Sequence, residues 1–202
     1  MYKLYFCDIN LITDNELQEE LNNVSLIRRR YILKKKNAED RKRSIAVDVL
    51  AKRALSDFTA VTEKPEILYG EHGKPYFANY NVHFNASHSG NYTVVALSDK
   101  PIGIDIEIIR DFSASAANKI LNQDEKTYIM QDDIHENRNR RFFEIWTAKE
   151  AYLKLLGLGL SGGIKTLQFS LKNNLLYPNK NINIIKNYSV KNAVISIIED
   201  NN

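Results

Sequence analysis

Two carboxylates stand inside an otherwise apolar run of the sequence, PIGIDIEIIR at residues 101–110. In a β-strand alternate side chains point to opposite faces, so Asp105 and Glu107 would share one face with Gly103 while the isoleucines face the core. The Cα atoms of the two acids would then be roughly 7 Å apart. Like charges at this distance repel each other, and burying either one unpaired is costly, so we expect a positive group between them.

A third carboxylate lies in the segment FFEIWTAKEAYLKLLG, which has helical periodicity. Glu150 and Lys154 are four residues apart and share one face of this predicted helix, an arrangement that an ordinary surface pair also adopts. Glu144 and Lys149 are predicted to be solvated charges. The stripe expected to face the core consists of Phe142, Ile145, Leu153 and Leu156.

Together, Asp105, Glu107 and Glu150 supply three hard oxygen ligands. Such a set suits Mg²⁺, which keeps several waters and takes its remaining ligands from substrate phosphates. The four histidines of the chain lack the spacing of a zinc or iron site. The sequence therefore predicts a magnesium site and phosphate chemistry rather than redox chemistry or zinc-dependent hydrolysis.

The segment NASHSG adds possible phosphate ligands. Ser87, His88 and Ser89 come at the end of a predicted strand just before a glycine, where hydroxyl and backbone N–H groups can meet phosphate oxygens. A histidine in such a turn is also common as a plain surface residue, so both interpretations of His88 stay open.

A strongly basic stretch, RRRYILKKKNAEDRKR, runs from Arg28 to Arg43 and holds nine basic residues against two acids. It is compatible with a solvated helix face or with an anion site for nucleic acid or for a phosphorylated small molecule. Because no recognised nucleic-acid-binding motif accompanies the stretch, we expect no nucleic-acid partner.

Composition is that of a globular protein: 202 residues, 44% hydrophobic and 26% charged, with a net charge of +3. This length suits one large domain or two small ones. The single cysteine, Cys7, excludes an intrachain disulfide and a cysteine zinc site. With no signal-type segment and no apolar span of ~20 residues, we expect a cytoplasmic protein with no membrane partner.

Patterns along the chain alternate between strand and helix signals. A helix is predicted from Ala38 through Phe58 and another from Arg140 to Gly157, with loops or turns at residues 70–77, 85–91 and 131–140 and hairpins after Ile164. The predicted strands are residues 2–8, 67–69, 82–84, 92–97 and 101–108. Each half offers a strand, a helix and further strands, so we predict two similar, closely packed α+β halves, residues 1–100 and 101–202.

The segments GKPYF, FNASHS, PIGIDIE and FFEIWTAKEAYLK, in this order, resemble the surfactin-synthetase-type (Sfp-like) 4′-phosphopantetheinyl transferases. They span roughly residues 70–155, and the upstream AEDRKRSIAVDVL helix also resembles the family. The compound pattern, G-[IV]-D-x-E followed by W-[ST]-x-K-E-[AS]-x-x-K, is highly specific. The resemblance implies an α+β pseudo-dimer with its active site between the halves, acting as a monomer. It also implies transfer of 4′-phosphopantetheine from coenzyme A to a serine of an acyl or peptidyl carrier protein, releasing adenosine 3′,5′-bisphosphate.

The resemblance also implies roles for individual residues. Asp105, Glu107 and Glu150 would ligate Mg²⁺ together with the coenzyme A pyrophosphate. Glu125 matches a carboxylate proposed in this family as the general base, with Glu150 acting through a water as the alternative. The implied catalytic residues are Glu125, Glu150, Lys154 and His88. The implied coenzyme A contacts are Arg28, Arg43, Gly73, Lys74, Pro75, Ser87, His88 and Lys154.

Within these contacts, His88 and Lys154 would meet the pyrophosphate, and the backbone of residues 73–75 would lie beside the adenine. Arg43 and the basic residues before it, from Arg28 onward, would hold the 3′-phosphate, and which of them does so stays open. The sequence departs from the family before this basic helix. Relatives often carry two separated lysines there, where this chain has Arg28 and Tyr31.

Two other protein classes fit part of the pattern. A Mg²⁺-dependent nuclease could use the same three carboxylates and the basic stretch, although the lysine usually set beside such acids on the strand is missing. A non-catalytic module that binds a nucleotide would keep the acids as structural groups.

The segment GLGLSGGI, residues 157–164, follows directly from the helix that carries Glu150 and Lys154. It is either a plain connection or part of the surface that meets the carrier protein. Because Leu158 and Leu160 lie beyond the helix end and need a covering partner, we predict that one of them contacts the carrier.

Overall fold

The computed structural model divides the chain into two compact units, Met1–Asp99 and Lys100–Asn202. It describes residues 1–59, 65–70, 74–157, 164, 167, 169–172, 175–178 and 185–200. None of the helices in those residues combines the length and the apolarity that crossing a membrane requires.

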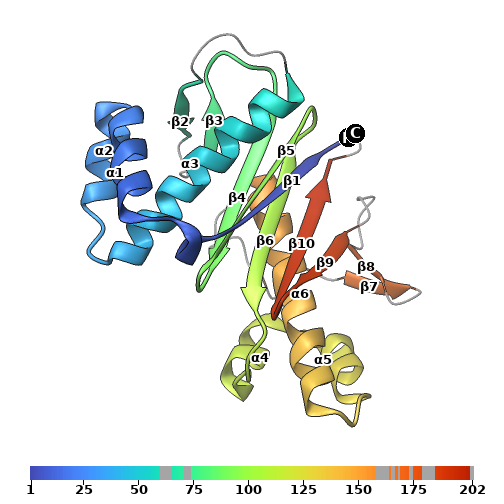
Figure 1. Cartoon of the computed structure of the whole chain (residues 1–202). Coiled ribbons are helices and arrows are strands. Elements are labelled where there is room, and N and C mark those ends of the chain that lie inside the picture. The colour runs from blue at the N-terminus through green and yellow to red at the C-terminus, as the bar shows by residue number, and fades with distance from the viewer. Residues whose placement is uncertain are drawn as a thin grey trace. The chain divides into compact units, whose positions relative to one another are not determined.

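The first unit builds an antiparallel sheet in the strand order β1-β5-β4, beside a separate β2-β3 hairpin (Figure 1). Its strands are β1 (Lys3–Asp8), β2 (Ile67–Tyr69), β3 (Pro75–Phe77), β4 (His83–Ser89) and β5 (Tyr92–Ser98). Its helices are the short 3₁₀ helix η1 (Ile9–Leu11), α1 (Asp14–Asn23), α2 (Leu26–Leu33) and α3 (Ala38–Phe58).

The core of the first unit lies where α3 packs on the sheet. Ala51, Ala54 and Leu55 are fully buried there with Val95 and Leu97 of β5. The small side chains of α3 let the helix approach the strands closely, because alanine adds little beyond the helix backbone. On the N-terminal half of α3, helices α1 and α2 pack through a second apolar cluster of Leu21, Ile32 and Ile45.

The second unit repeats this design with an antiparallel sheet ordered β6-β10-β9 and a separate β7-β8 hairpin (Figure 1). Its strands are β6 (Ile102–Ile108), β7 (Phe169–Lys172), β8 (Leu175–Pro178), β9 (Lys186–Val190) and β10 (Ala193–Glu199). Its helices are α4 (Ala114–Ile120), α5 (Gln123–Met130) and α6 (His135–Leu156).

The two units share one strand arrangement. In the first unit β1 and β4 flank β5, and in the second unit β6 and β9 flank β10. The last strand of each three-stranded sheet along the chain therefore lies in its middle. In each, a long helix packs on that sheet, α3 in the first unit and α6 in the second. The predicted α+β fold with two similar halves is therefore confirmed.

Several predicted elements match closely, including the helix from Ala38 to Phe58 and the helix end at Gly157. Gly157 has a left-handed backbone with φ of 71°, the conformation that glycine adopts most easily at a helix end. The strand signals at residues 67–69 and 101–108 also correspond to strands, β2 and β6.

Three predicted boundaries were wrong. Residues 85–89 are not a turn but the end of β4, because β4 pairs with β5 until Ser89 faces Tyr92 and leaves only a two-residue turn with Gly90 at φ of 54°. Residues 75–77, predicted as loop, form β3 against β2. The charged residues 135–140 form the first turns of α6 rather than a loop.

Candidate active site

The glycine of the IGIDIE run marks the closest approach of strand β6 to helix α6. A Cβ atom built on Gly103 would lie 2.0 Å from the carbonyl oxygen of Ala151 and 2.7 Å from the backbone nitrogen of Leu155. No real side chain tolerates such distances to backbone atoms, so only glycine lets α6 cross the strand here. The strand face that carries Asp105 and Glu107 is therefore the face against which α6 packs.

This packing brings Lys154 of α6 to Asp105 of β6. The Lys154 Nζ atom donates a hydrogen bond of 2.7 Å to Oδ1 of Asp105, whose side chain is buried, while that of Lys154 is partly exposed. The positive group expected near the two strand acids is thus a lysine of the long helix. Lys154 bonds Asp105 rather than forming the simple surface pair with Glu150 that helical spacing allowed.

Glu150 lies one turn before Lys154 and is 7% exposed. Burial, which is the largest effect, and the nearby carboxylate of Asp105 raise the pKa of Glu150 to about 7. Lys154 lowers this pKa and Glu107 raises it. The three predicted metal ligands therefore act on one another electrostatically within the second unit.

Glu107, at the end of β6, is also close to Arg110, whose Nη1 atom donates a 3.3 Å hydrogen bond to Oε2 of Glu107. Among the described residues, no three acidic, histidine or cysteine side chains are grouped closely enough to hold a metal ion. The chemistry of the donors nevertheless fits Mg²⁺, because all three are carboxylates and a cation would offset the repulsion that, after burial, adds to the pKa of Glu150. Binding would require Lys154 to share or release Asp105.

Glu125 lies in a different environment from the other three acids. Its side chain is fully buried, and its Oε2 atom accepts a hydrogen bond of 2.8 Å from Nζ of Lys149, also fully buried. The same oxygen accepts the backbone N–H of Asn122 at the start of α5, 2.8 Å away. Glu125 therefore forms a helix cap and a buried ion pair, and no solvent reaches its carboxylate.

The prediction that Lys149 is a solvated charge was wrong. Burial lowers the pKa of its ammonium group, while Glu125 opposes that change. The sequence held a signal, because Lys149 follows Phe142 by seven positions and Ile145 by four and so falls on the core stripe. Leu156, placed on that stripe by the sequence, is instead 49% exposed at the helix end.

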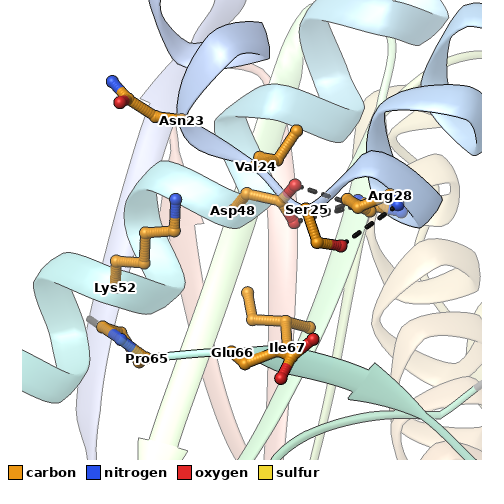
Figure 2. A pocket seen from close by; sticks show the side chains of 9 residues that line it. All are labelled: Asn23, Val24, Ser25, Arg28, Asp48, Lys52, Pro65, Glu66 and Ile67. Atoms are coloured by element: carbon orange, nitrogen blue, oxygen red, sulfur yellow. Dashed lines mark hydrogen bonds and ion pairs between the residues drawn. The ribbon is translucent and has the colours of Figure 1, made fainter. Parts of the chain in front are cut away.

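In the first unit, Arg28 of α2 forms a buried ion pair with Asp48 of α3. Its guanidinium donates hydrogen bonds of 2.8 to 3.2 Å to both carboxylate oxygens of Asp48 (Figure 2). It also donates a bond of 3.2 Å to the carbonyl oxygen of Ser44. Burial raises the pKa of Asp48 although Arg28 lowers it. The pair lines a pocket of about 200 Å³ with Lys52 and Glu66. The charge of Arg28 is thus used in holding α2 on α3.

Arg43 links the start of α3 to the turn after β4. Its Nη1 atom donates a 2.6 Å hydrogen bond to the carbonyl oxygen of Gly90, and its Nη2 atom bonds Oδ1 of Asp40 at 2.6 Å. The bond from Arg43 lowers the pKa of Asp40, with smaller contributions from Lys35 and His88. Arg43, Lys35 and His88 therefore all lie close enough to Asp40 to lower its pKa.

The other predicted coenzyme A residues of the first unit lie on or before strands β3 and β4, or outside the described residues. Ser87 is buried on β4, one position before the exposed His88. Lys74 precedes β3, burial lowers its pKa, and its charge lowers the pKa of His83. Gly73, Leu158 and Leu160 lie outside the residues that the structure describes.

Comparison with known families assigns both units. Residues 12–100 match the family model described as 4′-phosphopantetheinyl transferase, N-terminal, and residues 101–197 match that of the 4′-phosphopantetheinyl transferase superfamily. The chain belongs to the 4′-phosphopantetheinyl transferases. The Sfp-like resemblance noted from the sequence is thereby confirmed.

Three curated 4′-phosphopantetheinyl transferases illustrate the similarity. The chain is 33% identical to gsp of Aneurinibacillus migulanus over 141 residues, which cover 69% of this chain and 58% of gsp. It is 30% identical to ffp of Bacillus subtilis over 153 residues, 74% of this chain and 67% of ffp. It is 33% identical to Sfp of Bacillus subtilis (strain 168) over 126 residues, 61% of this chain and 55% of Sfp. The chain thus matches less than two thirds of the length of gsp and of Sfp.

Proposed function

We propose that the protein transfers 4′-phosphopantetheine from coenzyme A to a serine of an acyl or peptidyl carrier protein. The serine oxygen forms a bond to the phosphorus that bears pantetheine, the bridging P–O bond breaks, and adenosine 3′,5′-bisphosphate leaves. The main support is the contact of Lys154 with Asp105 beside a Glu150 whose pKa is about 7. A cluster that holds both signs of charge suits a pyrophosphate bound with a cation, and the family assignment names this chemistry.

In this proposal Asp105, Glu107 and Glu150 hold Mg²⁺ through their carboxylate oxygens. The bound ion would withdraw negative charge from the pyrophosphate oxygens as the P–O bond breaks. Burial is the largest cause of the raised pKa of Glu150, and the carboxylates of Asp105 and Glu107 add to it. A cation bound between the acids would offset this repulsion, which supports the assignment.

The cationic side chains are assigned to the phosphates of coenzyme A. Lys154 and His88 would offset charge on the pyrophosphate, while Arg43 would bind the 3′-phosphate. The proximity of Arg43, Lys35 and His88 to the same carboxylate, Asp40, supports the placement of Arg43 and His88 in one site. Residues 73–75 remain proposed beside the adenine and Ser87 beside the phosphates.

The serine proton needs an acceptor near the metal site. We assign it to Glu150 acting through a water, because Glu150 lies beside Asp105 at the proposed metal site, where the carboxylate can orient a water toward the serine hydroxyl. Glu125, the other acid considered from the sequence, is fully buried and paired with Lys149, so it has no access to a substrate hydroxyl.

We keep Leu158 and Leu160 as the residues proposed to contact the carrier protein. Each is changed to serine, and KM is measured separately for carrier protein and for coenzyme A. A raised KM for the carrier with an unchanged KM for coenzyme A would support docking there. Lower thermal stability with no change in the carrier KM would remove the assignment.

We further propose that the protein acts as a monomer in the cytoplasm. The two family matches follow one another on a single chain, which supports a monomer. The single cysteine suits a reducing compartment.

The deciding experiment is mass spectrometry of an apo carrier protein incubated with the enzyme, coenzyme A and Mg²⁺. A mass gain of one phosphopantetheine, with adenosine 3′,5′-bisphosphate in the filtrate, is the expected result. The Glu150→Ala and Asp105→Ala variants serve as inactive controls. An unmodified carrier across several carrier classes would overturn the proposal.

A further inference from the structure

A buried ion pair in the second unit connects the turn between α4 and α5 to the middle of α6. The ammonium of Lys149 donates hydrogen bonds to Oε2 of Glu125 at 2.8 Å and to the carbonyl oxygen of Ile120 at 2.7 Å. Both charged side chains are 0% exposed. Two charges so deeply buried require each other, although the Oε1 atom of Glu125 is buried without a hydrogen-bond partner among the described residues. The contact through Oε2 therefore ties the two parts of the unit together.

The carboxylate of Glu125 is also part of a reciprocal helix cap. Its Oε2 atom accepts the N–H of Asn122, and the Asn122 side chain accepts the N–H of Glu125 at 2.9 Å. The carbonyl of Ile120 belongs to the last turn of α4, where backbone acceptors lack helical partners. Lys149 therefore binds the end of one helix and the start of the next at once.

The position of Lys149 directly before Glu150 gives this contact a consequence for the site. Successive residues of an α-helix point about 100° apart, so fixing the direction of one fixes the other. On its opposite flank, α6 is held by the backbone contact at Gly103 and by the bond from Lys154 to Asp105. The two sets of contacts together determine the rotation of α6 about its own axis.

We infer that Lys149 and Glu125 are positioning residues that hold α6 in the rotation that keeps the Glu150 carboxylate beside Asp105. Glu125 has a helix-fixing role and does not accept the serine proton. The activity readout of this inference rests on the proposed transferase function and its Mg²⁺ readout on the proposed metal site, whereas its stability readout rests on neither.

The test compares Glu125→Gln, Lys149→Met and the double variant with wild type. Glutamine can keep the hydrogen bond to Asn122, and methionine has nearly the length of lysine without the charge. Each single variant leaves one buried charge unpaired and should lower Tm by roughly 5–10 °C. The double variant removes both charges and should recover at least half of that loss.

The neighbouring residues provide a matched control. Asp124 and Lys126 flank Glu125 on α5 and are more exposed, and Lys126 bonds the exposed Asn118. The Asp124→Asn, Lys126→Met double variant makes the same kind of change outside the core. We expect it to alter Tm by no more than about 1–2 °C.

A second readout separates positioning from plain stability. The Mg²⁺ concentration that gives half of the maximal rise in Tm is measured for every variant at a fixed pH. Each single variant should need at least about threefold more Mg²⁺ than wild type, because a rotated Glu150 binds it less well. Lys149→Arg, which keeps the charge, should stay closer to wild type than Lys149→Met. An unchanged Mg²⁺ dependence in all variants would overturn the positioning role.

The rate of phosphopantetheine transfer shows whether Glu125 acts as the general base. If Glu125 only positions α6, the double variant should transfer phosphopantetheine faster than Glu125→Gln alone, because the unpaired Lys149 charge is gone. If the double variant recovers Tm yet keeps a loss of about 10²–10⁴-fold in kcat, Glu125 is the base and the inference fails. If wild type shows no transfer, the proposed function fails, and the Tm measurements on the single and double variants still test the Lys149–Glu125 pair.

Discussion

Asp105 and Lys154 form an ion pair of 2.7 Å across a sequence separation of 49 residues. The pair joins the first strand of the second unit to its long helix, one turn from Glu150. Because Asp105 raises and Lys154 lowers the pKa of Glu150, the protonation of Glu150 reports on the arrangement of all three groups.

The raised pKa of Glu150 should be visible in the pH dependence of the free energy of unfolding. Its pKa of about 7 in the folded protein is above the ordinary 4.5, so the folded state keeps a proton that the unfolded state loses between these values. In metal-free buffer the free energy of unfolding should therefore fall as pH rises from about 5 to about 7. Glu150→Gln should lack this fall and should be more stable than wild type by ~1 kcal/mol or more at about pH 8.

Chemical denaturation in the presence of EDTA measures this difference. Glu136→Gln, an exposed position on the same helix, serves as the control and should follow the wild-type curve. Parallel pH curves for Glu150→Gln and wild type would show that the pKa of Glu150 is ordinary. Added Mg²⁺ should stabilise wild type more than the variant.

Gly103→Ala should disrupt the contact between β6 and α6. The new methyl group would meet backbone atoms of Ala151 and Leu155, which cannot move aside as side chains do. We expect a loss of about 3 kcal/mol in the free energy of unfolding and a large loss of transfer activity, since the helix carries Glu150 and Lys154. Gly157→Ala is the matched control, with open space around its Cβ and only a strained φ, and should cost about 1 kcal/mol. Equal costs for the two variants would contradict the close-approach explanation.

Arg28→Met tests whether Arg28 serves the fold or the ligand. Because the variant leaves the buried carboxylate of Asp48 unpaired, we expect a loss of about 3–5 kcal/mol. Adding Asp48→Leu should restore much of it, and the exposed Arg30→Met should change stability by less than about 0.5 kcal/mol. A stable Arg28→Met with a raised KM for coenzyme A alone would instead return Arg28 to the 3′-phosphate site.

Arg43→Ala tests the proposed phosphate contact. A charge-assisted contact to phosphate is worth about 1.5–3 kcal/mol, or roughly ten- to a hundredfold in affinity. The variant should lose this factor for coenzyme A and much less for 3′-dephospho-coenzyme A. Arg53→Ala, near the other end of α3, should leave both affinities unchanged. Equal losses for the two substrates would remove the 3′-phosphate assignment.

Local patterns in the sequence predicted the elements that carry the candidate site. Alternation located Asp105 and Glu107 on a strand, and helical spacing located Glu150 and Lys154 on a helix that ends at Gly157. Such periodicity reports which residues share a face, but not which neighbour covers that face. The helix proved to pack on the acidic face of β6, a fact that Gly103 encodes only once the partner helix is known.

The sequence did not predict which residues far apart along the chain contact each other. The partner of Arg28 is Asp48, 20 positions away, and that of Lys149 is Glu125, 24 positions away. A charged residue on the apolar stripe of a helix is predicted to be solvated as long as the residue that pairs with it is not known. The start of α6 was missed because its charged first turns lack an apolar stripe, yet Asn137 and Arg138 are held there by bonds to Asp132.

The middle position of the last strand in both sheets has a consequence for how the protein is made on the ribosome. The first sheet can close as soon as residues up to 98 have emerged, since β5 then joins β1 to β4. The strand bearing Asp105 has no neighbour in its sheet until β10 emerges some 90 residues later. The nascent chain should thus carry one folded half for a long period while the acidic strand of the other waits, exposed to chaperones and proteases, for residues 193–199.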